Sequence, residues 1–263
     1  MSNNHLKLHP NVAAASIILA AIGAGAVWAA SQQDQWGIHD MKRPQPRPVA
    51  TTGCCAAPAD AVVLFDGKDA AAWQKAGSNG EAAGWEVIDG NLCVKPGTGD
   101  IATRQSFGDC QLHMEWMVPT DLHCRGQHGC NSGVFFMNQY EVQVLNSNGN
   151  ETYADGMAAS LYGQNPPLVN ACKPQGEWNS YDIVFHGPRF ADDGQLLHPA
   201  TATVFMNGVL VQDHFTLWGS TAHGARAKYS AHPDQLPIRL QDHGDPLKFR
   251  NIWLRPLTAA DGT

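Results

Sequence analysis

Hydrophobic and polar residues alternate along many short segments of this chain, beginning near residue 61. Leu112, Met114 and Trp116 alternate with His113 and Glu115, so the apolar residues fall on one face of an extended strand and the polar residues on the other. Such a pattern is typical of a half-buried β-strand. The predicted strands are Val62–Phe65, Trp85–Ile88, Asn91–Val94, Cys110–Val118, Asn131–Met137, Tyr140–Leu145, Trp178–Phe185, Thr201–Met206, Val209–Gln212 and two strands within Pro237–Pro256.

Tight turns separate these segments. Asp89-Gly90 and Asn207-Gly208 are two-residue signals for β-hairpins, since both central residues of such a turn need a positive φ. The chain holds 26 Gly and 16 Pro, and no segment has a convincing amphipathic helical period. We therefore expect an all-β fold, a jelly-roll β-sandwich of two antiparallel sheets.

The segment Pro237–Pro256 carries an unusual run of polar residues. Period two places Arg239, Gln241 and His243 side by side on one face of its first strand. Either these side chains form a binding face, or they lie on the solvated outer face of an antiparallel sheet. Glu141 and Gln143 share a face of their own strand in the same way. The sequence does not show which strands are neighbours.

The N-terminal part of the chain differs in composition from the rest. Val12–Ala30 is uncharged for about nineteen residues, at the edge of the length that spans a bilayer. It suits either a secretory signal or a retained single-span anchor, and we favour the anchor. The expected organisation is a tail at 1–11, an anchor or signal helix at 12–30, a Pro-rich linker at 31–60, a jelly-roll domain at 61–257 and a tail at 258–263.

Seven cysteines indicate an oxidising compartment. We expect disulfides between Cys93 and Cys110 and between Cys124 and Cys130. The loop 121–130 also has the residue types of a metal site, although its spacing fits no standard zinc pattern. These features favour a domain in the periplasm or outside the cell, anchored to the membrane, or secreted if the N-terminal segment is cleaved.

The charge of the chain excludes one class of partner. Its formal net charge is −7, from 17 basic and 24 acidic residues, and no long basic run occurs. Nucleic acid is therefore not an expected partner.

An ordered set of short motifs then resembles one family of enzymes. The motifs are Leu64-Phe65-Asp66-Gly67-Lys68, Trp85-Glu86-Val87-Ile88-Asp89-Gly90, Asn131-Ser132-Gly133-Val134-Phe135-Phe136, Tyr140-Glu141-Val142-Gln143, Gly176-Glu177-Trp178-Asn179 and Leu240-Gln241-Asp242-His243-Gly244. Together they resemble the 3-keto-disaccharide hydrolase domain family across about residues 61–257. The family is similar in fold to concanavalin-like lectins and glucanases, so the resemblance implies the same jelly roll.

The resemblance implies cleavage of sugars that carry a ketone at C3. Such a ketone acidifies the C2 hydrogen, so the reaction needs a general base, a stabiliser of the enolate oxygen and an acid for the leaving group. On this basis Glu141 or His243 is the expected base or acid, and Arg239 and Gln241 are expected to hold the ketone oxygen.

The same resemblance suggests residues that contact the sugar. Asn131 and Gln143 are expected to bind hydroxyl groups, and Glu115 is either a further substrate-binding residue or a structural one. The inserted loop Cys124–Cys130 precedes Asn131 directly and is expected to cover or remodel the groove. The sequence leaves open whether a divalent cation takes part.

Two other functions fit the sequence. The domain could be a non-catalytic subunit of a large membrane assembly, such as a respiratory or photosynthetic complex, because Gly23 and Gly25 would allow close packing of the N-terminal helix. It could also be a carbohydrate-binding module, because a fold does not fix a function.

Overall fold

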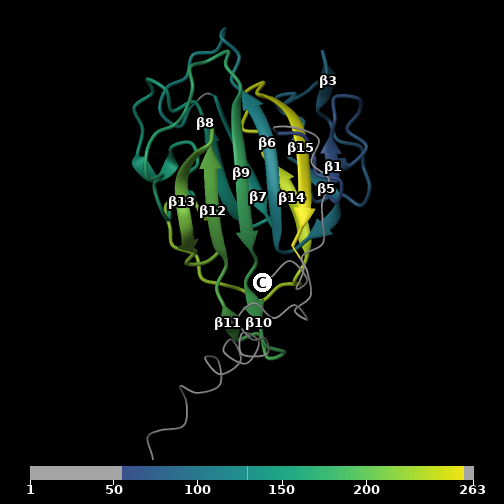
Figure 1. The fold of residues 1–263 in the computed structure, drawn as a ribbon, viewed down its shortest axis with the longest axis vertical. Helices are drawn as coiled ribbons and strands as arrows, with labels where there is room; N and C mark the ends of the chain where they lie inside the picture. Colours follow the sequence, from purple (N-terminus) through teal and green to yellow (C-terminus); the bar gives the residue numbers. More distant parts are fainter. Residues whose placement is uncertain (1–54, 129, 258–263) are drawn as a thin grey trace, which may run out of the picture. The chain divides into compact units, whose positions relative to one another are not determined.

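Two antiparallel β-sheets face one another in the computed structural model, which describes residues 55–128 and 130–257. Figure 1 shows β13, β12, β9, β6 and β15 in one layer and β8, β7, β14 and β5 in the other. The predicted all-β sandwich is confirmed. The elements are β1 (Val62–Phe65), β2 (Trp73–Lys75), β3 (Glu86–Ile88), β4 (Asn91–Cys93), β5 (Ile101–Phe107), β6 (Cys110–Met117), β7 (Asn131–Phe136), β8 (Tyr140–Leu145), the 3₁₀ turn η1 (Ala154–Gly156), β9 (Asn179–His186), β10 (Arg189–Phe190), β11 (Leu196–His198), β12 (Thr201–Met206), β13 (Val209–Thr216), β14 (Leu236–Leu240) and β15 (Lys248–Pro256).

The larger sheet has eight strands in the order β13-β12-β9-β6-β15-β4-β3, with β1 also paired to β15. Strand β15 is the junction of this sheet. One of its edges pairs with β6, while the other pairs with β4 at Lys248 and with β1 at Leu254. A single C-terminal strand therefore joins three earlier parts of the domain.

The smaller sheet has five strands in the order β2-β5-β14-β7-β8. Strand β14 lies at its centre, where Leu240 pairs with Ile101 of β5 and Val134 of β7. The short β10–β11 pair forms a separate hairpin. The smaller sheet matters most for function because it carries most of the polar residues that the sequence analysis selected.

The hydrophobic core lies between the two sheets. Phe136 and Tyr140 of the smaller sheet pack on Phe185 of β9, with ring centroids 4.6 and 5.7 Å apart. The hydroxyl of Tyr181, also on β9, donates a hydrogen bond to the Gln143 carbonyl across the core at 2.7 Å. Burial of this apolar surface is the main stabilising contribution to the sandwich. The strand residues that the alternation assigned to the core are all buried: Leu112, Met114, Trp116, Tyr140, Val142 and Val144.

Most predicted strands match the structure within one or two residues. Strand β14 is shorter than predicted because the chain leaves the sheet after Leu240, so the alternation of Arg239, Gln241 and His243 does not continue as one strand. Strands β2, β5, β10 and β11 were not predicted. The residues of β5, Ile101–Phe107, begin with three buried positions in a row and therefore show no alternation.

One of the two predicted disulfides is present. Cys124 and Cys130 are bonded, so their sulfurs are not free to act as the metal ligands that the loop's composition suggested. The pairing of Cys93 with Cys110 is wrong, because both are buried free thiols.

The register explains why Cys93 and Cys110 cannot meet. Cys93 pairs with Lys248, and Cys110 pairs with Pro256 on the opposite edge of the same strand. Eight residues of strand separate these partners by roughly 26 Å along β15. A disulfide needs Cα atoms within about 7 Å.

The predicted anchor at 12–30 and most of the linker at 31–60 lie outside the described residues. Within the part that the structure does describe, no helix has the length and apolar character needed to cross a membrane.

Candidate functional site

Three residues form a row across the outer face of the smaller sheet. Arg239 of β14 pairs with Phe135 of β7, and Phe135 pairs with Glu141 of β8. Residues directly opposite one another in antiparallel strands share a face. Neighbouring strands lie about 4.8 Å apart, so the guanidinium and the carboxyl group flank the Phe135 ring from opposite sides.

Glu141 is almost completely buried, with 5% of its surface exposed. Its side chain leans over Gly133, where a Cβ atom would collide with Glu141 Oε1 and lie 3.1 Å from its carboxyl carbon. Among the described residues, none forms a hydrogen bond to this carboxyl group. Because Gly133 has no side chain, it leaves room for the Glu141 carboxyl group on this face of the sheet.

Burial of Glu141 raises its pKa to about 8, because few waters can solvate the charged form. The positive charge of Arg239 lowers the pKa, and the negative charge of Asp100 raises it. Near neutral pH this side chain therefore exchanges its proton readily, as a general acid or base must.

Arg239 is held by neighbours other than Glu141. Its guanidinium stacks on the Phe135 ring, 3.6 Å from the ring centroid, and forms an ion pair with Asp100. Asp100 also accepts a hydrogen bond from the backbone N–H of Asp242 at 2.9 Å. The guanidinium is thus fixed over the sheet by the Phe135 ring and the Asp100 carboxylate.

The disulfide loop closes the other end of this face. The Gln127 carbonyl accepts a hydrogen bond from Asn131 Nδ2 at 3.1 Å, and Gln127 Oε1 accepts one from Gln143 Nε2 at 3.0 Å. The loop between Cys124 and Cys130 is thus hydrogen-bonded to the face that carries Glu141. Oδ1 of Asn131 and Oε1 of Gln143 are buried without a hydrogen-bond partner in the described structure. Such acceptors are unusual in a folded protein and suit the hydroxyl groups of a ligand.

Gln241 and His243 are placed differently from each other. The backbone N–H of Gln241 donates to the Gly133 carbonyl at 3.0 Å, which keeps Gln241 beside the row just described. His243 is exposed in the following turn. The structure therefore brings together Glu141, Arg239, Asn131, Gln143 and Gln241, and leaves His243 at the edge.

Glu115 lies on the other sheet. It faces outward from β6, where it pairs with Arg250 at 2.7 Å and accepts a hydrogen bond from Asn251 at 2.9 Å. The core separates this face from the face that carries Glu141, so the structure does not bring Glu115 to the other predicted site residues.

Several residues of the face were not selected from the sequence. Asp100 and Gln127 carry no motif that marks them, because their contacts depend on strand pairing and on the path of the disulfide loop. Phe135 lies within the motif Asn131–Phe136, but its apolar side chain gave no reason to select it as a site residue. A signal for Gln127 existed in its position inside the inserted loop.

No group of three or more potential metal ligands is found among residues 55–128 and 130–257.

These features define a class of protein: a jelly-roll β-sandwich with a buried acid, a fixed guanidinium and unpaired amide acceptors on the outer face of one sheet. The family model described as the 3-keto-alpha-glucoside-1,2-lyase-like domain matches residues 60–255. The chain belongs to this family, which confirms the resemblance found in the sequence.

Individual relatives agree with this assignment. A 3-keto-disaccharide hydrolase of Bacteroides thetaiotaomicron is 26% identical over 240 residues, which cover 74% of this chain and 78% of that protein. A crystal structure from Parabacteroides distasonis, of a protein proposed to be a glycosyl hydrolase, is 41% identical with a TM-score of 0.76 and covers 84% of this chain and 99% of that one. A second such structure from the same organism, 21% identical with a TM-score of 0.54, covers 75% and 94% of the two chains and supports the fold.

Proposed function

We propose that this domain cleaves 3-keto-glycosides by elimination at C1 followed by hydration, and that Glu141 is the base. The single observation that carries the proposal is the buried Glu141 carboxyl group with a pKa of about 8, which shares a face with a fixed arginine. The family membership and the 3-keto-disaccharide hydrolase of Bacteroides thetaiotaomicron support the choice of substrate class.

The reaction begins with transfer of the C2 proton to the Glu141 carboxylate. The electrons of the C–H bond form an enolate with the C3 oxygen, and Arg239 stabilises the negative charge on this oxygen. The enolate then reforms the ketone while the C1–O bond breaks, which leaves a double bond between C1 and C2. Water adds its hydroxyl group to C1, Glu141 returns its proton to C2, and the remaining proton of the water balances the one that the departing oxygen takes up to leave as an alcohol.

A raised pKa suits this role. A carboxylate whose conjugate acid has a pKa near 8 is a stronger base than an ordinary glutamate, and the C2–H group is only weakly acidic. Because only the deprotonated form is a base, we expect kcat/KM to rise with pH up to about 8. His243, exposed and without a described contact to the face, is the weaker candidate for the base.

The remaining polar side chains hold the sugar in this proposal. Oδ1 of Asn131 and Oε1 of Gln143 accept hydrogen bonds from sugar hydroxyl groups, because these two acceptors are otherwise unpaired in the described structure. Hydroxyl donors that fill them remove the penalty of a buried unsatisfied acceptor.

We further propose that the domain works outside the cytoplasm, anchored by residues 12–30. The Cys124–Cys130 disulfide supports an oxidising compartment.

Replacement of Glu141 by Gln tests the proposal, because Gln keeps the shape of the side chain and cannot accept a proton. We expect E141Q to lose about 10²–10⁴-fold in kcat on a 3-keto-disaccharide, with an unchanged circular dichroism spectrum. E115Q is the matched control on the opposite sheet and should retain most of the activity. A fully active E141Q would overturn the assignment.

A further inference from the structure

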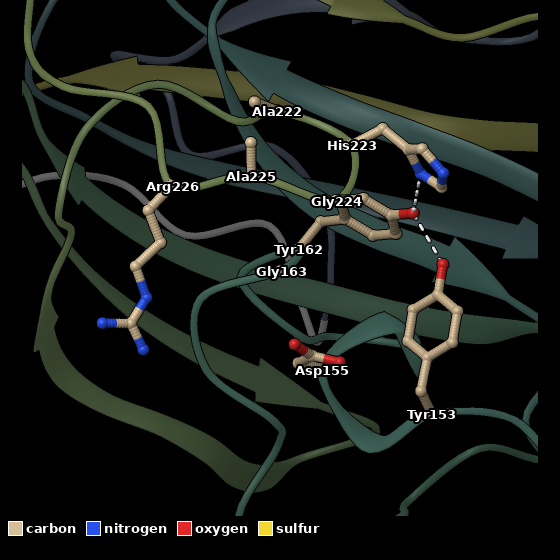
Figure 2. A pocket seen from close by; sticks show the side chains of 9 residues that line it. All are labelled: Tyr153, Asp155, Tyr162, Gly163, Ala222, His223, Gly224, Ala225 and Arg226. Carbon is tan, nitrogen blue, oxygen red and sulfur yellow. Dashed lines mark hydrogen bonds between the residues drawn. The ribbon is translucent and has the colours of Figure 1, made fainter.

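A pocket of about 450 Å³ lies between residues 153–163, which include η1, and the loop that follows β13. Its size lies within the roughly 300–1,000 Å³ of typical ligand sites. Figure 2 shows its side chains: Tyr153, Asp155, Tyr162, His223 and Arg226.

Both walls of the pocket are fixed to the strand residue that carries the base. The backbone N–H of Tyr162 donates to the Glu141 carbonyl at 3.3 Å, and the backbone N–H of Glu141 donates to Thr221 Oγ1 at 2.9 Å. Thr221 comes two residues before His223. The two segments that line the pocket are therefore held next to the backbone of Glu141.

A chain of hydrogen bonds crosses the pocket. The Tyr162 hydroxyl is 2.6 Å from the Tyr153 hydroxyl and 3.0 Å from His223 Nδ1, and Figure 2 shows the three side chains in line. Burial raises the pKa of Tyr162, and the hydrogen bond with Tyr153 and the charges of Glu141 and Asp155 raise it further. The phenol is therefore protonated at neutral pH and connected to the exposed His223 side chain.

The lining of the pocket suits a hydroxyl-rich or aromatic group. It combines two tyrosine rings with one acidic and one basic side chain, and sugars are bound through ring faces together with polar groups of this kind. The Arg226 guanidinium stacks on the exposed Trp218 ring at 3.9 Å from its centroid, which keeps this side chain at the rim. The two charges oppose one another, so the pocket does not select an anion.

We propose that this pocket receives the leaving group, the sugar or aryl unit attached through the C1 oxygen, and that Tyr162 is the acid that protonates that oxygen. The proposal rests on the function proposed above and assigns the acid for its second step, in which the C1–O bond breaks. Glu141 takes the proton from C2 on one side of the bond, while Tyr162 serves the departing oxygen on the other.

The proton balance is complete with the residues present. As the C1–O bond breaks, its electron pair goes to the departing oxygen, which takes the Tyr162 hydroxyl proton and leaves as a neutral alcohol. The Tyr162 phenolate then recovers a proton from solvent through the exposed His223 side chain, and the water that adds to C1 releases one proton to solvent in exchange. No oxidant or reductant is required.

Replacement of Tyr162 by Phe, assayed on two substrates that differ only in their leaving group, tests the proposal. p-Nitrophenyl 3-keto-α-glucoside releases a stable phenolate and needs little acid assistance, whereas a 3-keto-α-disaccharide releases a poor leaving group. We expect Y162F to lose about 10²–10⁴-fold in kcat/KM on the disaccharide and only a few-fold on the aryl substrate.

The matched control is Tyr229→Phe. The Tyr229 hydroxyl binds only the backbone of Ala200 and Leu217 within the described structure and lies outside the pocket lining. Y229F should have the same kcat/KM as the parent protein on both substrates.

Two failures can be told apart. If the parent protein cleaves both substrates and Y162F is unaffected, or is impaired equally on both, Tyr162 is not the acid and the inference is overturned. If the parent protein cleaves neither substrate, the proposed function itself is overturned, and the assignment of Tyr162 with it.

Discussion

Each outer face of the sandwich carries a glutamate near an arginine, buried at Glu141 and partly buried at Glu115, and the two acids have opposite surroundings. On the larger sheet, Arg250 and Asn251 both bind the Glu115 carboxylate directly. Burial pushes the pKa of Glu115 upward, but these hydrogen bonds and the charge of Arg250 outweigh burial and lower the pKa. On the smaller sheet, the arginine near Glu141 pairs with Asp100 instead.

The difference shows how the protein keeps one acid inert and the other reactive. Glu115 is held charged by its partners, which is what a structural ion pair requires. Glu141 has burial without a compensating partner, so its charged form is disfavoured. Burial alone therefore does not indicate function. The informative feature is whether the nearby arginine pairs with the glutamate itself or with another acid.

The largest expected effect on the difference between Glu141 and Glu115 comes from a side chain added at Gly133, next to the Glu141 carboxyl group. We expect Gly133→Ala to reduce kcat about 10²-fold or more, because the new Cβ displaces the Glu141 carboxyl group. The new Cβ also lies 2.9 Å from the Phe135 ring, so both side chains must shift and the unfolding free energy should fall by about 1–3 kcal/mol.

A double-mutant cycle with E141Q checks the reason for this loss. If the substitution at Gly133 acts through Glu141, adding G133A to E141Q should change the residual activity little. Additive losses would show that Gly133 acts independently of the acid.

The pH dependence of stability should have opposite signs at the two acids. The pKa of Glu141 is raised in the folded state, so its contribution is most favourable below its unfolded pKa near 4.5 and is lost as the pH rises through about 8. The pKa of Glu115 is lowered, so its contribution is present above its unfolded pKa and is lost as the pH falls through the folded value.

Urea unfolding of the parent protein, E141Q and E115Q at pH 5, 7 and 9 measures both contributions. E141Q should gain stability relative to the parent as the pH rises. E115Q should be less stable than the parent by about 1.5–3 kcal/mol at pH 7. Parallel pH profiles for the two variants would contradict the comparison.

The smallest expected effect comes from Asp100→Asn. Loss of this negative charge removes one influence that raises the pKa of Glu141 and frees Arg239 from its ion pair. Both changes favour the charged acid, so the pH at which kcat/KM reaches half its plateau should move downward. An unmoved or higher midpoint would show that Asp100 does not tune the acid.

The sequence predicted what depends on local pattern. Alternation located the core residues of β6 and β8, and the Asp89-Gly90 and Asn207-Gly208 turns are present with positive φ at each residue. Glu141 was selected from its motif and Arg239 from the alternation of its strand, and the structure places them in one row. Their roles stay predictions until the variants are measured.

The remaining features depend on long-range pairing. The separation of Cys93 from Cys110 follows from the registers on β15, and the position of Glu115 follows from which sheet contains β6. The protonation of Glu141 depends on where Arg239 points. None of these can be read from spacing along the chain, because each requires knowledge of which strands are neighbours.

The place of β15 also affects how the domain is made. This strand pairs with β1, β4 and β6, and it holds the last residues of the sandwich. During synthesis, these three strands therefore lack their partner until the C-terminal segment emerges, and the larger sheet cannot close until residue 256 has left the ribosome. Contacts between such distant parts of a chain slow folding, so the newly made domain remains incomplete, with apolar faces uncovered, until β15 is available to pair.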